Sequence, residues 1–507
     1  MGGKKRVVSL LEAITSPSLP AGLAESYLYI NGEVALHRDM DSRLASLPNE
    51  LRYIPDGLNG VIANARARPN TPEKKLADFF YKRQVFLEMP SRIVDSRAVS
   101  LDRNDHGMMR DFVPDVDTFV RRTLRGLEIL KGDPNSPYSG VARAMLIGGQ
   151  GSRALKWTAE HPLAAAIHGI AHNPSRQLYP VGLPNGPRLA DIILQAMHMV
   201  DKQLDVISPV LAMTSAANAQ EVVNAFRCLG SIWSTDQLAA AILWNQDSMR
   251  QKSVETGEVL PDLKSPGHSD FSNNISRFGI IDELNRRGVR YLIFSNGDEF
   301  LFGPDPVLLS IAEDLESEDY GMFAVAVANS NDQFGGGLVR LSDGSVRLVE
   351  TPVMPWQLVR QGRPPAGINT TFYIMSIRKM LEQKEDLIRA PKFPCIKERL
   401  VDGGSQQVLN PDGWAGDVFT GALKTFPLWW ERDGGNFLGV KSGERMYETN
   451  PTLFNDMGGL TPLAYTTRAA AAYRYILEEL LSGHSGRIRD VGQALLEVNY
   501  RYPMFGR

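Results

Sequence analysis

The segment Leu146-Ile147-Gly148-Gly149-Gln150-Gly151-Ser152-Arg153 carries the strongest structural signal in the chain. The apolar run before it, Ala144–Ile147, has the character of a buried strand. Glycines directly after a strand let backbone N–H groups approach an anion, because no Cβ stands in the way. Arg153 follows them, and a guanidinium binds phosphate through paired hydrogen bonds. The segment predicts a phosphate-binding turn; a tight surface turn beside a solvated arginine is the alternative.

The composition indicates a soluble protein with several domains. The chain has 507 residues, 43% hydrophobic and 22% charged, with a formal net charge of −3. This length exceeds what one hydrophobic core organises. The absence of a basic block argues against nucleic acid as a partner. No apolar run approaches about 18 residues, no secretory signal is recognisable, and the two cysteines form no disulfide or metal pattern. We expect a cytoplasmic protein without a membrane partner; its oligomeric state stays open.

Strands and helices are expected to alternate through the middle of the chain. Strands are predicted at 144–147, 206–213, 291–294 and 321–328, and helices at 73–86, 116–131, 187–203, 219–229, 280–287, 306–316 and 462–481. A hairpin around Asp343-Gly344 joins 338–341 to 346–349, and 411–414 is rich in turn residues. The alternation predicts an α/β fold with a mostly parallel, doubly wound sheet.

Breaker residues at 132–137 suggest a division of the chain. Residues 1–135 are expected to form a mainly helical N-terminal region. The α/β domain is expected at 136–410, and a smaller C-terminal domain at 411–507.

Three loops are expected on one edge of this sheet. They are the glycine turn after Ile147, Thr214-Ser215, and Asn296-Gly297-Asp298. The carboxyl ends of parallel strands line the ligand crevice in such folds. Asp298 is therefore a candidate Mg²⁺ ligand, because this hard cation prefers oxygen and phosphate. A turn or helix-capping aspartate is the alternative.

Four further residues are candidates with weaker support. Gly267 and His268 lie in a loop where the glycine admits a base or ribose and the histidine donates to a sugar or phosphate; a surface histidine is the alternative. Gln246 is suited to read a base edge, although exposed glutamines usually have no such role. Lys441 follows an apolar stretch that presents its ammonium to a phosphate; a solvated lysine at a strand end is the alternative.

In this order the motifs resemble those of the UDP-sugar pyrophosphorylase superfamily, the uridylyltransferases for UDP-glucose, UDP-sugar and UDP-N-acetylhexosamine. The resemblance covers roughly 140–445. Besides the glycine loop, the similar segments are Leu178–Pro184, Met213-Thr214-Ser215, Trp244-Asn245-Gln246, Pro266–Asp270, Ser295–Asp298, Gly336-Gly337 with Leu348-Val349-Glu350, Ile368-Asn369-Thr370 and Leu438–Lys441.

The resemblance implies a fold, an activity and a set of roles. The fold is a Rossmann-like doubly wound mixed sheet of the nucleotide-diphospho-sugar transferase type, with 136–410 as the catalytic domain. The activity is condensation of UTP with a sugar 1-phosphate to a UDP-sugar and pyrophosphate. The implied catalytic residues are Arg153, Arg176 and Lys441; the nucleotide-binding residues are Gly148, Gly149, Gly151, Gln246, Gly267 and Asn296; the acceptor-binding residues are His268, Gly337, Glu350 and Asn369; and the Mg²⁺ ligand is Asp298.

The chain also departs from the family pattern. The family's Pro-Lys, which carries a catalytic lysine, is replaced by Pro174-Ser175-Arg176 after an insertion at 154–175, and Lys156 is another candidate for the missing amine. Ser269 and Glu299 replace a glycine and an asparagine.

These departures keep two alternatives open: a nucleotide-sugar-binding regulatory homologue with impaired catalysis, and a nucleotidyltransferase with a non-sugar phosphate acceptor. A dehydrogenase is less well supported, because the glycine spacing lacks the third glycine of the dinucleotide fingerprint and Asp191 lies within a predicted helix. The sugar is not fixed, since His268 favours a glucose-type acceptor whereas Gln150 and 178–184 favour N-acetylhexosamines.

Overall fold

The computed structural model describes a large central part of the chain. The described residues are 8–9, 98–147, 198, 201–202, 204–215, 218, 222, 234–246, 249–253, 256–264, 267–296, 305–328, 336–350, 366–388, 393–401 and 404–430. Every structural statement below concerns these residues.

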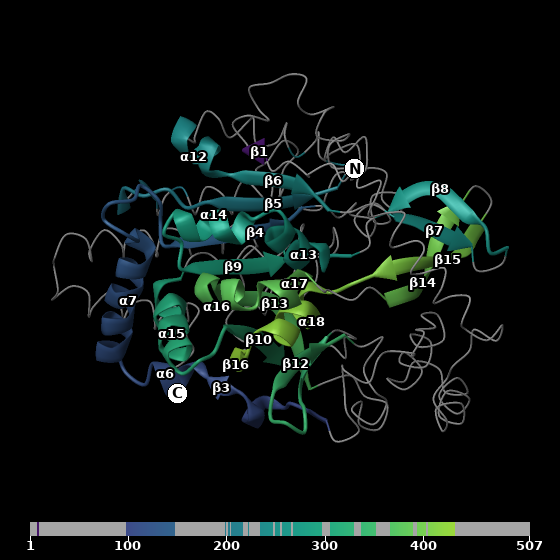
Figure 1. The fold of residues 1–507 in the computed structure, drawn as a ribbon. Coiled ribbons are helices and arrows are strands. Elements are labelled where there is room, and N and C mark those ends of the chain that lie inside the picture. Colours follow the sequence, from purple (N-terminus) through teal and green to yellow (C-terminus); the bar gives the residue numbers. More distant parts are fainter. Residues whose placement is uncertain are drawn as a thin grey trace, which may run out of the picture.

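A nine-stranded mixed sheet forms the centre of the described structure (Figure 1). In spatial order its strands are β1 (Val8–Ser9), β6 (Ile242–Asn245), β5 (Val210–Thr214), β4 (Val141–Leu146), β9 (Tyr291–Asn296), β13 (Gly367–Ser376), β10 (Met322–Ala328), β16 (Thr425–Trp430) and β3 (Gly107–Met108). The pairings make seven of these strands parallel to one another, whereas β1 and β13 run in the opposite direction.

Two smaller antiparallel sheets flank the central one. The first contains β12 (Val346–Val349), β11 (Gly337–Arg340) and β2 (Val99–Ser100). The second contains β14 (Phe393–Val401), β15 (Gly404–Asp412), β7 (Met249–Ser253) and β8 (Val259–Lys264). The β11–β12 hairpin turns at Asp343-Gly344, where Gly344 has a positive φ of 84° and the Asp343 carboxylate accepts from the N–H of Ser345 at 2.8 Å.

Helices cover both faces of the central sheet. Successive side chains of a strand point to opposite faces, and in this sheet both sets are apolar and buried. Tyr291 and Ile293 of β9 pack in one apolar cluster, and Leu292 and Phe294 pack in the other. The first cluster includes side chains of α6 (Met109–Phe112), α7 (Val116–Lys131) and α15 (Pro306–Ser317). The second includes side chains of α12 (Thr235–Ala240), α13 (Asp270–Arg277), α14 (Ile280–Arg286), α16 (Ile377–Glu382), α17 (Lys384–Ile388) and α18 (Ala415–Ala422). A 3₁₀ turn spans Arg103–Asp105.

Most of the predicted elements that fall within the described residues are confirmed. The helix at 116–131 matches α7, and the hairpin and the helices near 280–287 and 306–316 are present. The predicted strand at 144–147 was placed too late, because β4 begins at Val141 and carries Arg143 as a buried side chain, only 2% exposed. The predicted strand at 206–213 begins only at Val210. The turn expected at 411–414 was wrong in its first half, because pairing with β14 continues β15 through Asp412.

The mixed α/β class is therefore confirmed. The doubly wound description and the boundaries at 135 and 410 stay predictions; β3 comes from before the first boundary and β16 from after the second. The predicted helices at 73–86, 219–229 and 462–481, and most of 187–203, lie outside the described residues. In the described part of the chain, no helix combines the length and apolar character needed to span a bilayer.

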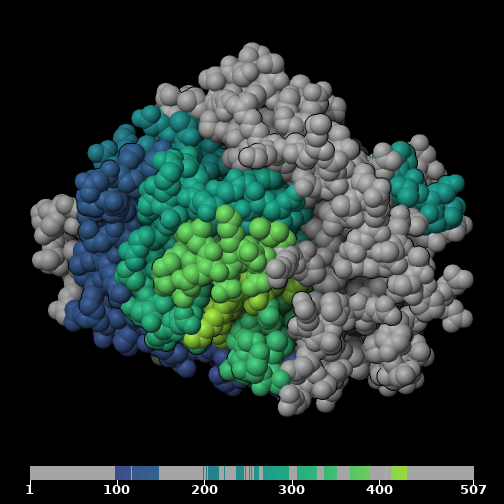
Figure 2. Space-filling view, in the orientation of Figure 1, coloured from purple at the N-terminus to yellow at the C-terminus, as the bar shows by residue number. Residues whose placement is uncertain are grey.

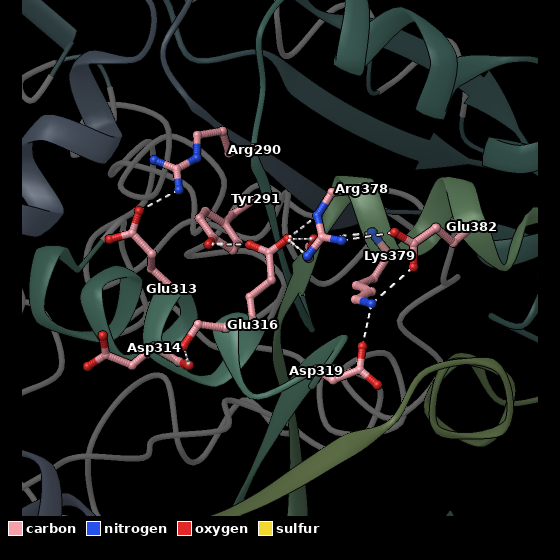
Figure 3. A network of polar contacts seen from close by, with 11 residues as sticks. Arg290, Tyr291, Glu313, Asp314, Glu316, Asp319, Arg378, Lys379 and Glu382 are labelled. Carbon is pink, nitrogen blue, oxygen red and sulfur yellow. Dashed lines mark hydrogen bonds and ion pairs between the residues drawn. The ribbon is translucent and has the colours of Figure 1, made fainter.

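A polar network fastens α15 to the start of β9 and the end of β13 (Figure 3). The Glu316 carboxylate accepts from the Tyr291 hydroxyl at 2.6 Å, from the Ser376 hydroxyl at 2.7 Å and from Nε of Arg378 at 2.9 Å. These bonds hold its pKa below the ordinary value although burial acts in the opposite direction. The network lies at the edge of the sheet where β9 begins, and it connects helix α15 to the neighbouring strands β9 and β13.

A single glycine sets the distance between α7 and α15. A Cβ placed on Gly126 would lie 1.8 Å from the carbonyl oxygen of Pro306, which is backbone and has no alternative rotamer. We expect Gly126→Ala to lower the free energy of unfolding by about 1–3 kcal/mol, because the overlap outweighs the better helix propensity of alanine, about 1 kcal/mol.

Urea unfolding of the two proteins measures the difference. Leu124→Ala is the control, because Leu124 lies on the same helix and is 44% exposed. Equal stability of Gly126→Ala and the wild type would contradict this packing.

Candidate active site

Four parallel strands end at one edge of the sheet: β4, β5 and β9, whose loops were predicted to lie together, and β6, which was not among the predicted strands. Leu146 at the end of β4 pairs with Met213 of β5 on one side and with Asn296 of β9 on the other. Thr214 at the end of β5 pairs in turn with Asn245 of β6. The chain that follows each strand therefore starts at this edge, which we call the rim. β13 begins at the rim because it is antiparallel, and Gly367 pairs with Ala328 at the end of β10.

Asn218 joins two of the rim loops. Its side-chain amide donates to the carbonyl oxygen of Ile147 at 2.6 Å, and its oxygen accepts from the N–H and the hydroxyl of Ser215, both at 2.9 Å. The side chain is buried, with 2% of its surface exposed. Asn218 thus fixes the chain directly before Gly148, and the sequence interpretation missed it.

Two of the predicted nucleotide-binding residues lie on this rim. Gln246 follows β6, and its backbone N–H donates to the carbonyl oxygen of Thr214 at 2.8 Å while its side chain is buried. Asn296 is the last residue of β9.

The loop of Gly267 and His268 is held against the start of α18. Gly267 has a φ of 91°, a backbone conformation that favours glycine. The N–H of Ala415 donates to Nδ1 of His268 at 3.0 Å, and the N–H of Ser269 donates to the carbonyl oxygen of Gly413 at 3.0 Å. An accepting Nδ1 requires the ring proton of a neutral histidine to be on Nε2, which makes Nε2 a donor.

Three of the predicted acceptor-binding residues form a second group. A Cβ on Gly336 would lie 2.7 Å from a carboxylate oxygen of Glu350. The Glu350 carboxylate therefore occupies space that a side chain at position 336 would fill. The carbonyl oxygen of Gly336 accepts from the N–H of Asn369 at 2.7 Å. Gly337 starts β11 and pairs with Val349, next to Glu350.

Asn369 is held by an irregularity in β13. Ala324 pairs with Tyr373 whereas Ala326 pairs with Asn369, so β13 contains two extra residues at this point. Thr371 within it has a φ of 61°, a strained conformation for a β-branched residue. The Asn369 side chain spans the bulge, accepting from the N–H of Thr371 at 3.1 Å and donating to the Tyr373 hydroxyl at 2.8 Å.

Tyr373 connects this second group to the histidine loop. It is fully buried, and its ring stacks on Phe294 with the centroids 5.6 Å apart. A Cβ on Gly416 would lie 2.3 Å from its hydroxyl oxygen, so α18 approaches the tyrosine as closely as glycine allows. Because Ala415 binds His268 and Gly416 contacts Tyr373, the first turn of α18 connects His268 to Asn369, and Gly336 connects Asn369 to Glu350. The sequence interpretation missed Tyr373, although it lies four residues after Asn369 on the same strand.

The other predicted site residues lie outside the described residues. They are Gly148, Gly149, Gly151, Arg153, Arg176, Asp298 and Lys441, together with the alternative Lys156. Within the described residues, no group of three or more His, Cys, Asp or Glu side chains is placed to hold a metal ion.

A buried carboxyl lies beside this cluster. Burial raises the pKa of Asp417 in α18 to about 7, although the charge of Arg347 acts to lower it. The unfolded chain has the ordinary value near 3.8, so between about pH 4 and pH 7 the native state binds more protons than the unfolded state. The free energy of unfolding therefore falls as the pH rises through that range.

We expect Asp417→Asn to remove this dependence. The stability of the variant relative to the wild type should be greater at pH 8 than at pH 5, as measured by urea unfolding. Asp319→Asn is the control, because its bond with Lys379 holds the pKa of Asp319 below the ordinary value, so this carboxylate is ionised throughout and its replacement should change the stability equally at pH 5 and pH 8. A pH-independent difference for Asp417→Asn would show that this carboxyl is not perturbed.

Comparison with known proteins identifies relatives of the chain. The UTP–glucose-1-phosphate uridylyltransferase family matches residues 173–365. No curated protein sequence matches the chain.

Among solved structures, a UDP-N-acetylglucosamine pyrophosphorylase from Trypanosoma brucei in complex with an inhibitor is similar with a TM-score of 0.54 and 13% identity, covering 88% of this chain and 95% of its own. A protein described as a UDP-N-acetylglucosamine pyrophosphorylase from Entamoeba histolytica has a TM-score of 0.50 and 16% identity, covering 66% and 81%. A UDP-glucose phosphorylase from Trypanosoma brucei has a TM-score of 0.50 and 14% identity, covering 69% of each chain.

At these identities the solved structures show a shared fold. Together with the family match over 173–365, they confirm the resemblance to the UDP-sugar pyrophosphorylase superfamily drawn from the motifs.

Proposed function

We propose that this chain, a relative of the UDP-sugar pyrophosphorylases, is a uridylyltransferase that condenses UTP with a sugar 1-phosphate to give a UDP-sugar and pyrophosphate. The observation that carries the proposal is the convergence at one rim. The glycine turn and Gln246 follow parallel strands that end together, Asn296 is the last residue of a third such strand, and β13 brings Asn369 to the same edge. His268 joins Asn369 through α18 and Tyr373, and Glu350 joins it through Gly336.

The reaction places few covalent demands on the protein. An oxygen of the sugar phosphate attacks the α-phosphorus of UTP, a new P–O bond forms, and the bond to the departing pyrophosphate breaks. Positioning and charge stabilisation supply most of the rate enhancement in such transfers. We assign the backbone of Gly148, Gly149 and Gly151 to the triphosphate and ribose, and Arg153 to the leaving pyrophosphate. Arg176 and Lys441 neutralise the charge that accumulates in the transition state.

The uracil end and the sugar end are assigned to different groups of residues. Gln246 and Gly267 recognise the uracil, since a carboxamide offers both a donor and an acceptor to a base edge. Asn296 completes the nucleotide side. The acceptor is held by His268 through its Nε2 proton, by the Glu350 carboxylate, by Asn369 and by the backbone at Gly337. A carboxylate and an amide are suited to the hydroxyl groups of a sugar.

Asp298 is the residue that we assign as the Mg²⁺ ligand. This residue follows β9 by two positions, and β9 ends beside β4 at the rim. A carboxylate at this point suits a hard cation, and the bound ion would supply charge neutralisation to the phosphates.

The departure at Arg176 favours a second candidate, a protein that binds a nucleotide-sugar without turning it over. The test is pyrophosphate release from UTP with a panel of sugar 1-phosphates, alongside calorimetric binding of UTP. Release with at least one sugar supports the proposal, and binding without release supports the second candidate. Release only with a phosphate that is not on a sugar would identify a different acceptor, and absence of UTP binding would overturn the proposal.

We expect Asp298→Asn to lower kcat by about a hundredfold, because an amide keeps the shape of the carboxylate but binds the cation weakly. Asp282→Asn is the control, since Asp282 lies on the surface helix α14 and pairs with Lys384. Initial rates over a range of Mg²⁺ concentrations measure the effect. Rates equal to the wild type at all concentrations would exclude Asp298 as a ligand.

Gly336→Ala tests the acceptor side alone. The new methyl group would overlap with the Glu350 carboxylate and displace it. We expect the KM for the sugar phosphate to rise about tenfold, equivalent to about 1.4 kcal/mol, while the KM for UTP stays unchanged. Glu350→Gln should shift the same constant. An equal rise in both KM values would show that Glu350 does not act on the acceptor.

A further inference from the structure

A pocket lies on the side of the sheet away from the rim. It has a volume of about 580 Å³ and is bordered by Thr425, the first residue of β16, by the β11–β12 hairpin and by the end of α18. β16 is parallel to β10, so its start lies at the edge opposite to the rim. Figure 1 shows β12 and β16 in the lower part of the molecule, where they contact each other. In the same part of Figure 2, green and yellow-green segments reach the surface. The proposed function uses none of the residues in this lining.

Three cations and two carboxylates line the pocket, and four of these five groups already have partners. Arg340 lies 3.9 Å from the Asp105 carboxylate. The Asp343 carboxylate accepts from the hairpin N–H of Ser345. Lys424 donates to the carbonyl oxygen of Glu318 at 3.0 Å and lies 4.2 Å from the centre of the Tyr320 ring.

Arg347 is the exception. Among the described residues its guanidinium makes no hydrogen bond and no ion pair within 4 Å, and Asp417 and Asp343 act on it only through longer-range attraction. The side chain is half-buried, and burial lowers its pKa. A Cβ on Gly421 would lie 2.4 Å from one guanidinium nitrogen, so this glycine leaves room for the arginine. A guanidinium has five N–H donors, and a half-buried one without partners is suited to an anion that enters the pocket.

The other residues that line the pocket indicate which organic group is attached to the anion. Tyr320 and Phe426 pack edge to face with their ring centres 5.3 Å apart, and Val346, Leu423 and Pro427 add apolar surface. The pocket volume is far larger than a phosphate group, so the apolar wall has space for an organic part.

From these observations we propose that this pocket binds a small phosphorylated molecule, with its phosphate on Arg347 and its organic part against Tyr320 and Phe426. Arg347 is well matched to such a group, since a planar fork binds two phosphate oxygens at once. The proposal does not depend on the function assigned to the rim.

Calorimetric titration tests the proposal with two probes, inorganic phosphate and AMP. Each titration is compared with that of Arg347→Gln, so that a nucleotide site at the rim, which both proteins share, cancels from the difference. We expect wild-type protein to bind AMP more tightly than phosphate, and Arg347→Gln to weaken both at least tenfold. Arg286→Gln, an exposed cation paired with Glu283 on α14, should leave both affinities unchanged. Equal affinity of phosphate and AMP would contradict the role of the aromatic wall.

Arg347→Lys keeps the proposal testable if the glutamine variant does not fold, which thermal unfolding would show. This variant retains the charge but loses the fork, so its binding should fall between those of wild type and Arg347→Gln. Crystals soaked in tungstate give the location directly, as an anomalous peak beside Arg347. No binding of either probe up to about 10 mM, equal affinities in the Arg347 variants and wild type, or a peak only elsewhere would overturn the proposal.

Discussion

The parallel pairing of β4 with β5 and β9 determines where the candidate catalytic loops leave the sheet. Leu146 lies between Met213 and Asn296, so the glycine turn starts at the same level as the chain after β9. A slip of one residue in β4 would move Ala142 and Ala144 from one apolar cluster to the other face and would bury Arg143 among different side chains. The apolar clusters on both faces therefore fix the register of β4, and this register determines which residues lie at the rim.

A second constraint operates where helix α18 meets the sheet. Gly416 allows the helix to approach the Tyr373 hydroxyl, and that hydroxyl accepts from Asn369. The same turn of the helix supplies the N–H that binds His268. The strained Thr371 stays in place because the pairs of Asn369 with Ala326 and of Tyr373 with Ala324 flank it, and because the Asn369 side chain accepts from its N–H. Packing of α18 thus fixes the side chains of Tyr373, Asn369 and His268, whose positions do not follow from their local sequence.

Local features explain which elements could be predicted. Helix α7 was predicted with its observed bounds, because Asp115 caps its first turn by accepting from the N–H of Thr118 at 2.7 Å and Gly132 ends it at a φ of 70°. The common edge of the predicted parallel strands followed from their alternation with helices. Strand β13 was missed as an element, since its reversed direction depends on pairing with β9 and β10, both distant in sequence.

The site could be predicted only in part for the same reason. His268 and Asn369 were selected as motif residues, but the contacts that connect them run through Tyr373 and α18, which the motifs do not include. Arg143 shifted the predicted start of β4 because a charged residue suggests exposure, whereas tertiary packing buries it.

The reversal of β13 also affects how the family fold can diversify. Because β12 ends next to Glu350 and β13 starts at Gly367, both ends of the connection between them are anchored beside the acceptor cluster. Lengthening such a connection costs little free energy, about 0.6 kcal/mol for each doubling. Insertions and deletions at 351–366 offer a route by which evolution can resize the proposed acceptor end of the site while the nine strands keep their pairing.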